Sequence, residues 1–189
     1  NFLDSKYVFL ANTHPPLQQQ MAGALKSARL IVADTMNLWI QTTRDELVKL
    51  LGMIHGLVLN DGEARLLTGK KNLIEAARDV LKMGPKFVVI KKGEHGAMFF
   101  SEHETYVLPA FPTEKVIDPT GAGDSFAGGM MGYLAAQRNF EPKTLKEAMA
   151  YGILVASFNV EDFSLDRLKQ IDRSDLDMRM ESYRKMLSF

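Results

Sequence analysis

Apolar residues along the chain follow two alternating patterns: short continuous runs, and stretches with an apolar residue every three or four positions. The short runs are long enough for buried β-strands and cover residues 7–10, 29–34, 56–60 and 87–91. Strands alternating with helices predict an α/β fold, with a mostly parallel sheet flanked by helices on both faces. Four helices are predicted between these strands. The first is marked by Leu17, Met21, Ala24 and Leu25, and the second by Leu47, Leu50 and Leu51 after a cap at Thr42 or Thr43. The third runs through Glu63, Leu66 and Leu67 and ends at Gly69, and the fourth covers residues 73–83.

The second half of the chain continues differently. Residues 96–100 and 105–108 flank a polar turn and predict a small antiparallel hairpin. Residues 116–118 are interpreted as the end of another strand, and the spacing that follows predicts a helix of about four turns. A further helix is predicted through residues 145–156, and the polar tail, residues 166–187, is predicted to be helical in pieces.

Polar residues stand at the ends of the predicted strands. Asp34, Asn60, Lys91 and Asp118 each follow an apolar run. In mostly parallel sheets, ligands bind outside the carboxyl ends of the strands. The sequence therefore predicts a binding site at this edge, on the residues alone.

Composition excludes several classes of protein. Lys plus Arg and Asp plus Glu both count 23, so no global charge favours nucleic acid or an anionic membrane as a partner. The absence of cysteine excludes disulfides and thiolate metal sites. No apolar run reaches the length of a membrane span and no signal-peptide pattern opens the chain, so we expect a cytoplasmic protein with small-molecule ligands.

The stretch from Gly121 to Asp124 predicts an anion site. Gly121 and Gly123 permit a tight turn, and the free N–H groups of the following first helical turn attract negative charge. Asp124 has two interpretations. It either complements the helix dipole as an ordinary first-turn carboxylate, or accepts the proton of an attacking hydroxyl group beside a bound phosphate.

Residues 118–126, Asp-Pro-Thr-Gly-Ala-Gly-Asp-Ser-Phe, closely resemble the signature of the ribokinase-like (PfkB) family of carbohydrate and nucleoside kinases. The resemblance implies transfer of the γ-phosphate of ATP to a primary hydroxyl group of a sugar or nucleoside, with Mg²⁺. It also implies that Asp124 is the general base. The turn residues that would hold the phosphoryl group or border the nucleotide are Gly121, Ala122, Gly123 and Thr120.

Two further motifs resemble those of the family. Asn60 and Glu63 match its Asn-x-x-Glu motif, whose glutamate supports Mg²⁺ through water; locally, the same spacing predicts a helix capping box, and the two roles can coexist. Residues 91–96, Lys-Lys-Gly-Glu-His-Gly, resemble the family's Lys-x-Gly-x-x-Gly loop. The resemblance implies that Lys92 and Gly93 border the nucleotide, although a solvated turn explains them equally well.

Two residues near the signature extend the resemblance. Asp118 matches a position that the family associates with a monovalent cation such as K⁺, and its alternative is an Asp-Pro turn that ends a strand. Ser157 falls in the segment where family members line the adenine ring. Asp34 and Asn37 resemble the family's Asp-x-Asn segment but lack the proline and arginine that often accompany it.

Other nucleotide and metal motifs fail on spacing. Residues 62–70 end in Gly-Lys but have six rather than four residues between the glycines of a P-loop. The Gly121-x-Gly123 turn lacks the third glycine of a dinucleotide fingerprint, which argues against a Rossmann-type oxidoreductase. The four histidines share no metal-ligand spacing.

The chain resembles the C-terminal two-thirds of such a kinase, and we treat residues 1–189 as one nucleotide-binding and catalytic domain. The family's N-terminal third supplies most substrate contacts and a lid, through which members often form homodimers. The alternative hypothesis is a non-catalytic nucleotide-binding or scaffold protein of the same fold. The sequence does not distinguish a sugar from a nucleoside as substrate.

Overall fold

The computed structural model describes residues 2–188 and divides the chain into two compact units. The N-terminal unit takes the chain up to Gly93 together with Ala97–Val107. The C-terminal unit takes Glu94–Gly96 and the chain from Leu108 onward. That the two units behave as one domain, as expected from the sequence, stays a prediction.

A six-stranded sheet organises the N-terminal unit, in the order β1-β2-β3-β4-β5-β6. Strands β1 to β4 run parallel, and β5 pairs with β4 in the antiparallel direction. The prediction of a mostly parallel α/β sheet with a small hairpin is therefore confirmed. The strands are β1 Tyr7–Leu10, β2 Leu30–Asp34, β3 Gly56–Asn60, β4 Phe87–Lys91, β5 Ala97–Ser101 and β6 Thr105–Leu108.

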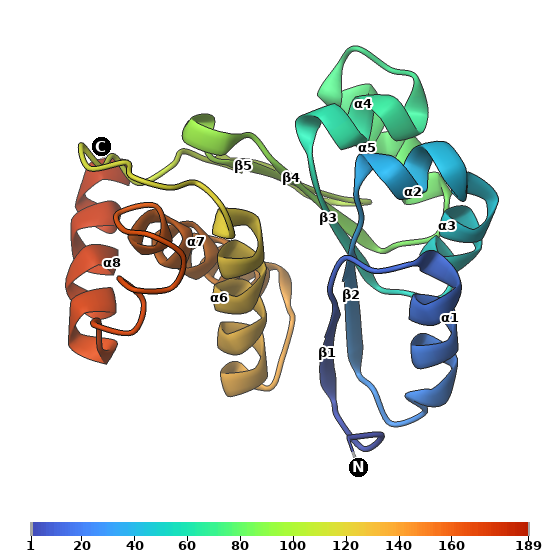
Figure 1. Cartoon of the computed structure of the whole chain (residues 1–189), viewed down its shortest axis with the longest axis horizontal. Coiled ribbons are helices and arrows are strands. Elements are labelled where there is room, and N and C mark those ends of the chain that lie inside the picture. The colour runs from blue at the N-terminus through green and yellow to red at the C-terminus, as the bar shows by residue number, and fades with distance from the viewer. Residues whose placement is uncertain (1, 189) are drawn as a thin grey trace. The chain divides into compact units, whose positions relative to one another are not determined.

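Helices pack on one face of this sheet (Figure 1). Because side chains alternate along a strand, Ala33, Leu59 and Ile90 join the helices in one core, while Val32 and Val89 point to the opposite face and are also buried. An apolar residue at every position is typical of a parallel strand buried on both faces. The helices are α1 Pro15–Ala24, α2 Asn37–Thr42, α3 Arg44–Leu51, α4 Asp61–Thr68 and α5 Leu73–Lys82.

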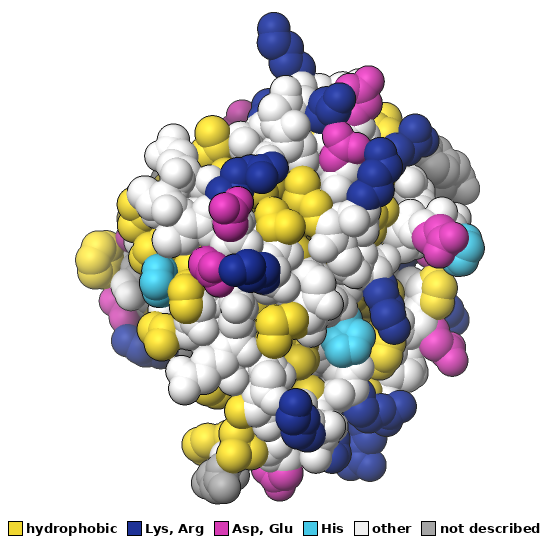
Figure 2. Space-filling view, turned by 90° about the vertical axis from the view of Figure 1, so that its right-hand side faces the viewer, with side chains coloured by type: hydrophobic (Ala, Val, Ile, Leu, Met, Phe, Trp, Pro, Cys, Tyr) yellow, Lys and Arg dark blue, Asp and Glu magenta, His cyan; other side chains and the backbone are white. Residues whose placement is uncertain are grey.

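The predicted apolar face of α1 is correct for Leu25, which is buried in the core, and wrong for the residues before it. Leu17 and Met21 are 52% and 48% exposed, whereas Gln18 is 1% exposed and faces the sheet. The helix is turned this way because the Gln18 amide donates hydrogen bonds to backbone carbonyl groups at the ends of β1 and β2. Figure 2 shows apolar side chains lying between charged ones on the face of the molecule that it views, and exposed apolar residues of this kind are common on soluble proteins.

The C-terminal unit consists mainly of three helices, α6 Ala122–Gln137, α7 Pro142–Asn159 and α8 Arg173–Leu187; a short 3-10 turn, η1 Gly93–His95, follows β4. Helices α6 and α7 pack closely because glycines stand at their contact. A β-carbon on Gly152 would lie 2.7 Å from the carbonyl oxygen of Phe126, and one on Gly129 would lie 2.8 Å from Val155 Cγ2. Among residues 2–188, no helix has both the length and the hydropathy of a membrane-spanning segment.

The strand end predicted at residues 116–118 is absent from the structure. The N–H groups of Ile117 and Asp118 instead donate to the carbonyl oxygen of Val160, at 2.8 and 3.4 Å. Val116 and Ile117 are 61% and 53% exposed, so their apolar character does not reflect a buried strand. The segment reaches α6 as an irregular loop held by the end of α7.

Candidate functional site

The start of α6 is the first candidate site, and it lies in the C-terminal unit. Gly121 is the N-cap residue, with φ 80° and ψ −2°, a left-handed conformation that glycine adopts without strain. Its carbonyl oxygen accepts the Ser125 N–H at 2.8 Å, which fixes the first turn. No side chain caps the helix, so the first-turn N–H groups of Gly123 and Asp124 have no side-chain acceptor. This is the open helix start that the sequence predicted.

The other residues of the turn differ in whether their polar groups already have hydrogen-bond partners. The Ala122 N–H donates to the Pro119 carbonyl oxygen at 3.1 Å, so this predicted anion donor already has a partner within the turn. Asp124 lies at the third position of α6 and is exposed, and its carboxylate does not cap the helix. No hydrogen bond or ion pair of this carboxylate occurs within residues 2–188. Its role as a general base stays a prediction, and its geometry leaves it open to a ligand.

Asp118 and Thr120 shape the turn before α6. The Asp118 carboxylate accepts the Thr120 N–H at 2.9 Å. This hydrogen bond lowers the pKa of Asp118, with further contributions from the Thr120 side chain and the Ser164 N–H. Asp118 therefore stays ionised and ties the turn to the loop that follows α7.

Behind Gly121 lies a buried amide, Asn159, at the end of α7. Asn159 is 0% exposed and its Nδ2 donates to the Ser164 carbonyl oxygen at 2.6 Å. Its Oδ1 has no hydrogen-bond partner among the described residues, and a β-carbon on Gly121 would lie 3.8 Å from it. A buried oxygen without a partner is uncommon and needs a ligand, a water or an ion to explain it.

Ser157, which the resemblance places near the adenine ring, is a buried residue of α7. It is 7% exposed, and its hydroxyl donates to the Leu154 carbonyl oxygen and accepts from Arg179 Nη1. Both bonds are made within the C-terminal unit. Contact with a nucleotide stays a prediction for Ser157.

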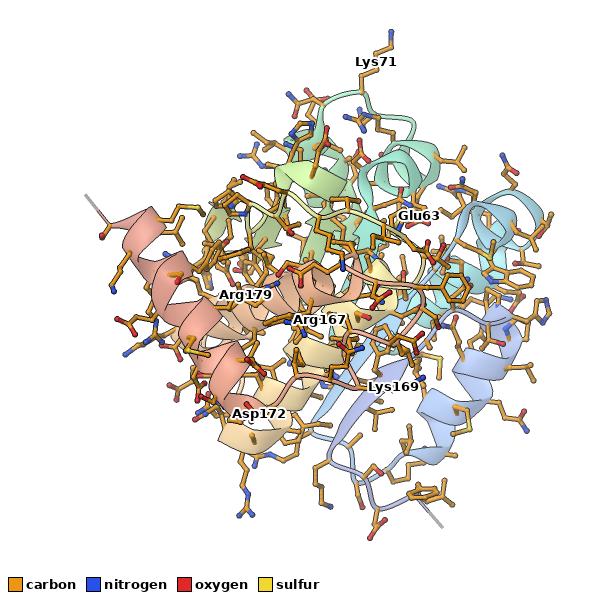
Figure 3. The ribbon with its side chains drawn as sticks, turned by 60° about the vertical axis from the view of Figure 1, so that its left-hand side comes forward. Glu63, Lys71, Arg167, Lys169, Asp172 and Arg179 are labelled. Atoms are coloured by element: carbon orange, nitrogen blue, oxygen red, sulfur yellow. The ribbon has the colours of Figure 1, made fainter. Side chains whose placement is uncertain are left out.

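Arg179 of α8 centres a charged cluster that the sequence analysis missed. Its Nη2 lies 2.7 Å from Glu161 Oε1, and its guanidinium carbon lies 3.3 Å from the centroid of the Phe158 ring. Burial lowers the pKa of Arg179, and the Glu161 carboxylate opposes this effect. Arg167 also bonds Glu161, at 3.3 Å, and Figure 3 shows Arg167 and Arg179 near each other. The cluster fixes α8 to the end of α7, and no local pattern marks residues so far apart in the sequence.

The second candidate site lies in the N-terminal unit, where β3 leads into α4. Asn60 Oδ1 accepts the Glu63 N–H at 2.8 Å, and Glu63 Oε2 accepts the Asn60 N–H at 2.7 Å. The predicted capping box is therefore confirmed. Glu63 is nonetheless only 7% exposed, and this burial raises its pKa. The hydrogen bond from the Asn60 N–H lowers the pKa, the negative charge of Asp34 raises it, and the positive charge of Lys91 lowers it. Figure 3 shows Glu63 among the side chains of this unit.

An ion pair spans the strand ends beside this capping box. Lys91 Nζ lies 3.4 Å from Asp34 Oδ2, with side chains 17% and 8% exposed. Asp34 belongs to β2 and Lys91 to β4, so the pair crosses the end of the intervening strand, β3. The next residues, Lys92 and Gly93, are half-buried and exposed respectively, and Gly93 has φ +55°. The sequence indicated both Lys91 and Lys92, and the structure places Lys91 in the ion pair with Asp34.

The charged groups of the N-terminal unit suit a metal that keeps most of its water. Within residues 2–188, no three His, Cys, Asp or Glu side chains are grouped to hold a metal ion. Mg²⁺ is usually bound by one or two carboxylates together with water and phosphate oxygens. Glu63 fits that pattern better than it fits a closed metal site.

Comparison with known proteins finds relatives that are named as nucleoside kinases. It is 33% identical to a cytidine kinase of Thermococcus kodakarensis, over 74% of this chain and 51% of the relative. It is 27% identical to a nucleoside kinase of Thermoplasma acidophilum, over 98% of this chain and 58% of the relative. The chain thus spans little more than half the length of these relatives.

Solved structures show the same fold. A ribokinase of Thermotoga maritima superposes with a TM-score of 0.77 at 21% identity, over 96% of this chain and 59% of that one. A fructokinase of Vibrio cholerae O395 gives 0.79 at 18% identity, over 92% and 60%. The sequence profile of the pfkB family of carbohydrate kinases matches residues 5–170, a range that contains both candidate sites. The chain belongs to the pfkB family of carbohydrate kinases.

Proposed function

We propose that this chain forms the nucleotide-binding and catalytic part of an ATP-dependent kinase whose acceptor is a primary hydroxyl group of a sugar or nucleoside. The start of α6 carries the proposal. Gly121 leaves the helix without a side-chain cap, and Asp124 presents an exposed carboxylate three residues later. Donors for a phosphoryl group and an acceptor for a proton therefore occur together within one turn.

The reaction follows from these groups. Asp124 accepts the proton of the acceptor hydroxyl as its oxygen bonds to the γ-phosphorus atom, and ADP leaves with the electrons of the broken bond. The N–H groups of the turn stabilise the charge on the transferred phosphoryl group. Gly123 and Asp124 have N–H groups without side-chain acceptors, so they suit this role better than Ala122, whose N–H bonds Pro119.

Mg²⁺ and the nucleotide complete the proposal. Mg²⁺, when bound, neutralises phosphate charge, and Glu63 with Asn60 would hold its water shell. Thr120, Lys92 and Gly93 would border the nucleotide. One neighbouring structure, a putative ribokinase II of E. coli, is a complex with ATP and Mg²⁺, which supports the pair of cofactors at the level of the fold.

We also propose a K⁺ ion behind the α6 turn. The ionised Asp118 carboxylate and the partnerless Asn159 Oδ1 are oxygen ligands of the kind that alkali cations accept. An ion there would satisfy the buried oxygen and support Gly121 from behind. Thermal unfolding in KCl and in LiCl at equal ionic strength tests for this ion. The midpoint of the wild type should be higher in KCl than in LiCl, whereas the midpoint of Asp118→Asn should be the same in both salts.

The substrate proposal favours a nucleoside as the first acceptor to test. The relatives named as a cytidine kinase and a nucleoside kinase match 74% and 98% of this chain. Two ribokinases, at 36% and 30% identity, match only 54% and 60% of it. Homodimer formation and a cytoplasmic location stay predictions from the sequence. Sedimentation velocity tests the first of these.

Substitution of Asp124 tests the proposed reaction. Asp124→Asn should lower turnover by about 10²–10⁴-fold, the range for a general base, while a non-hydrolysable ATP analogue still binds. Release of ADP with cytidine, other nucleosides and sugars measures turnover, and calorimetry measures binding. Asp45→Asn is the matched control, because Asp45 is an exposed first-turn carboxylate of α3.

Two results would count against this proposal. An Asp124→Asn protein that keeps the wild-type rate removes Asp124 as the general base. Wild-type protein that binds the analogue and phosphorylates none of the acceptors supports the alternative, a non-catalytic nucleotide-binding protein of the same fold.

A further inference from the structure

We propose that Arg179 of α8 is a positioning residue for the anion turn, residues 121–124 at the start of α6. Arg179 acts through the end of α7, which it holds and which lies next to the anion turn. The inference deepens the proposed function and rests on it, because the N–H groups of the anion turn are those proposed to stabilise the transferred phosphoryl group.

Arg179 contacts the end of α7 in three ways. Its Nη1 donates to the Ser157 hydroxyl at 2.9 Å, and its Nη2 donates to Glu161 Oε1 at 2.7 Å. Its guanidinium carbon lies 3.3 Å from the centroid of the Phe158 ring. The side chains of Arg179 and Glu161 are only 14% and 12% exposed, so water screens their interaction little. One planar group with two hydrogen bonds and a ring contact fixes residues 157–161 in a single arrangement.

Val160 connects this segment to the loop that leads into the anion turn. Its carbonyl oxygen accepts the N–H groups of Ile117 and Asp118, at 2.8 and 3.4 Å. No strand pairing holds this loop within residues 2–188, so these hydrogen bonds determine where it runs. A displacement of residues 157–161 would therefore displace the beginning of the anion turn.

Asn159 connects the same segment to the anion turn itself. Asn159 is 0% exposed, and its Nδ2 donates to the Ser164 carbonyl oxygen at 2.6 Å. Its Oδ1 would lie 3.8 Å from a β-carbon on Gly121. Gly121 is the N-cap residue of α6, so its backbone determines where the following N–H groups point. The Arg179 contacts on both sides of Asn159 therefore bear on the direction of those donors.

A second arginine of α8 shows how a purely structural contact with α7 would look. Arg173 Nη2 donates to the Tyr151 hydroxyl at 3.2 Å, and its guanidinium carbon lies 5.3 Å from the Tyr151 ring centroid. Arg173 is 67% exposed, and Tyr151 lies about two turns before the end of α7. Arg173 thus joins α8 to the middle of α7, whereas Arg179 joins it to the segment beside the anion turn.

Arg179→Lys tests the inference, because it keeps the positive charge beside Glu161 and removes the planar group. A lysine ammonium group cannot bond Ser157 and Glu161 and also lie flat against Phe158. Turnover should fall by about 10- to 100-fold, since a displacement of about 1 Å at a reacting group can have an effect of that size. Binding of a non-hydrolysable ATP analogue should change far less, because the lost contacts act mainly in the transition state.

A nuclear magnetic resonance spectrum of protein labelled with ¹⁵N-glycine gives a readout that does not depend on activity. The amide resonances of Gly121 and Gly123 should shift in Arg179→Lys, while that of Gly69, in the N-terminal unit, should not. Glu161→Gln is a second variant, and it should shift the same two resonances because it removes the carboxylate that Arg179 bonds.

Arg173→Lys is the matched control, because it changes another arginine that bonds α7 from the same helix. It should keep the wild-type turnover and leave the resonances of Gly121 and Gly123 in place. If Arg173→Lys lowers turnover and shifts these resonances as much as Arg179→Lys does, only the attachment of α8 matters, and Arg179 has no positioning role of its own.

Other results would also overturn the inference. Wild-type turnover in Arg179→Lys shows that Arg179 does not serve the reaction, and a loss of turnover without a shift of Gly121 or Gly123 shows that it acts elsewhere. Wild-type protein that phosphorylates no acceptor contradicts the proposed function instead. The two glycine resonances then decide whether Arg179 holds the anion turn.

Discussion

Gln18 illustrates how one polar residue determines the orientation of a helix. Its Nε2 lies 3.1, 3.0 and 3.1 Å from the carbonyl oxygens of Leu10, Ala11 and Asp34, which stand where β1 and β2 end. Those carbonyl groups have no further strand residue to pair with, so the amide satisfies them inside the core. The spacing of Leu17 and Met21 predicted the wrong face, because apolar periodicity indicates which side chains can bury apolar surface and contains no information on the hydrogen bonds of a polar side chain.

Replacing Gln18 should therefore cost more than replacing either exposed apolar neighbour. We expect Gln18→Leu to lower the free energy of unfolding by about 1–3 kcal/mol, because buried carbonyl groups lose their donor. Leu17→Gln, one residue away and exposed, should change it by less than about 0.5 kcal/mol. Urea denaturation of the three proteins measures both values, and equal losses would contradict the assigned face of α1.

The candidate residues also differ in how far the sequence could predict them. The Asn60–Glu63 capping box was predictable because its partners are three residues apart and its geometry is local. The Asp34–Lys91 pair joins residues 57 positions apart across a strand, so it depends on the order of the sheet. The burial of Asn159 beside Gly121 was not predictable, because it follows from how α7 packs and not from any local pattern.

At the scale of elements, the contact between α6 and α7 depends on glycine. Gly129 and Gly152 allow the two helices to approach until a β-carbon on either would overlap its neighbour. Gly132 lies on the same helix as Gly129 and is exposed, and a β-carbon added there would have no neighbour within 4 Å. Glycines of similar appearance in the sequence therefore have opposite structural meanings.

This difference predicts opposite effects of alanine. Gly152→Ala should destabilise the protein by about 1–3 kcal/mol, because its β-carbon meets the backbone of Phe126 and one helix must move. Gly132→Ala should stabilise it by about 0.5–1 kcal/mol, since alanine restricts the unfolded chain and favours the helix. Thermal unfolding measured by circular dichroism shows whether each substitution raises or lowers the stability. A stabilising Gly152→Ala would show that the helices have room to separate.

The whole molecule raises the question of whether its two compact units unfold together. Candidate residues occur in each unit: Glu63 and Lys92 belong to the N-terminal unit, and Asp118 and Asp124 belong to the C-terminal unit. The sequence contains no linker, repeat or change of composition that marks a boundary. We therefore predicted one domain. The six strands of the sheet were predictable from their apolar runs, whereas the apolar residues at 116–118 wrongly predicted the end of another strand.

A single tryptophan makes this prediction measurable. Trp39 is the chain's one tryptophan and belongs to the N-terminal unit, so its fluorescence reports on that unit, whereas circular dichroism reports on both. In a single cooperative domain, Gly152→Ala in the C-terminal unit should shift both transitions by the same amount. A shift in circular dichroism with unchanged Trp39 fluorescence would show that the units unfold separately.

The uncapped start of α6 has a consequence for protein engineering. A capping side chain typically stabilises a helix by about 1 kcal/mol, and α4, α5 and α8 each have one, from Asn60, Asn72 and Asp172. A search for thermostable variants would therefore choose the start of α6 early, because Gly121 supplies no cap. If the proposed function holds, that substitution would fill the space meant for phosphate, and the more durable protein would be the poorer catalyst.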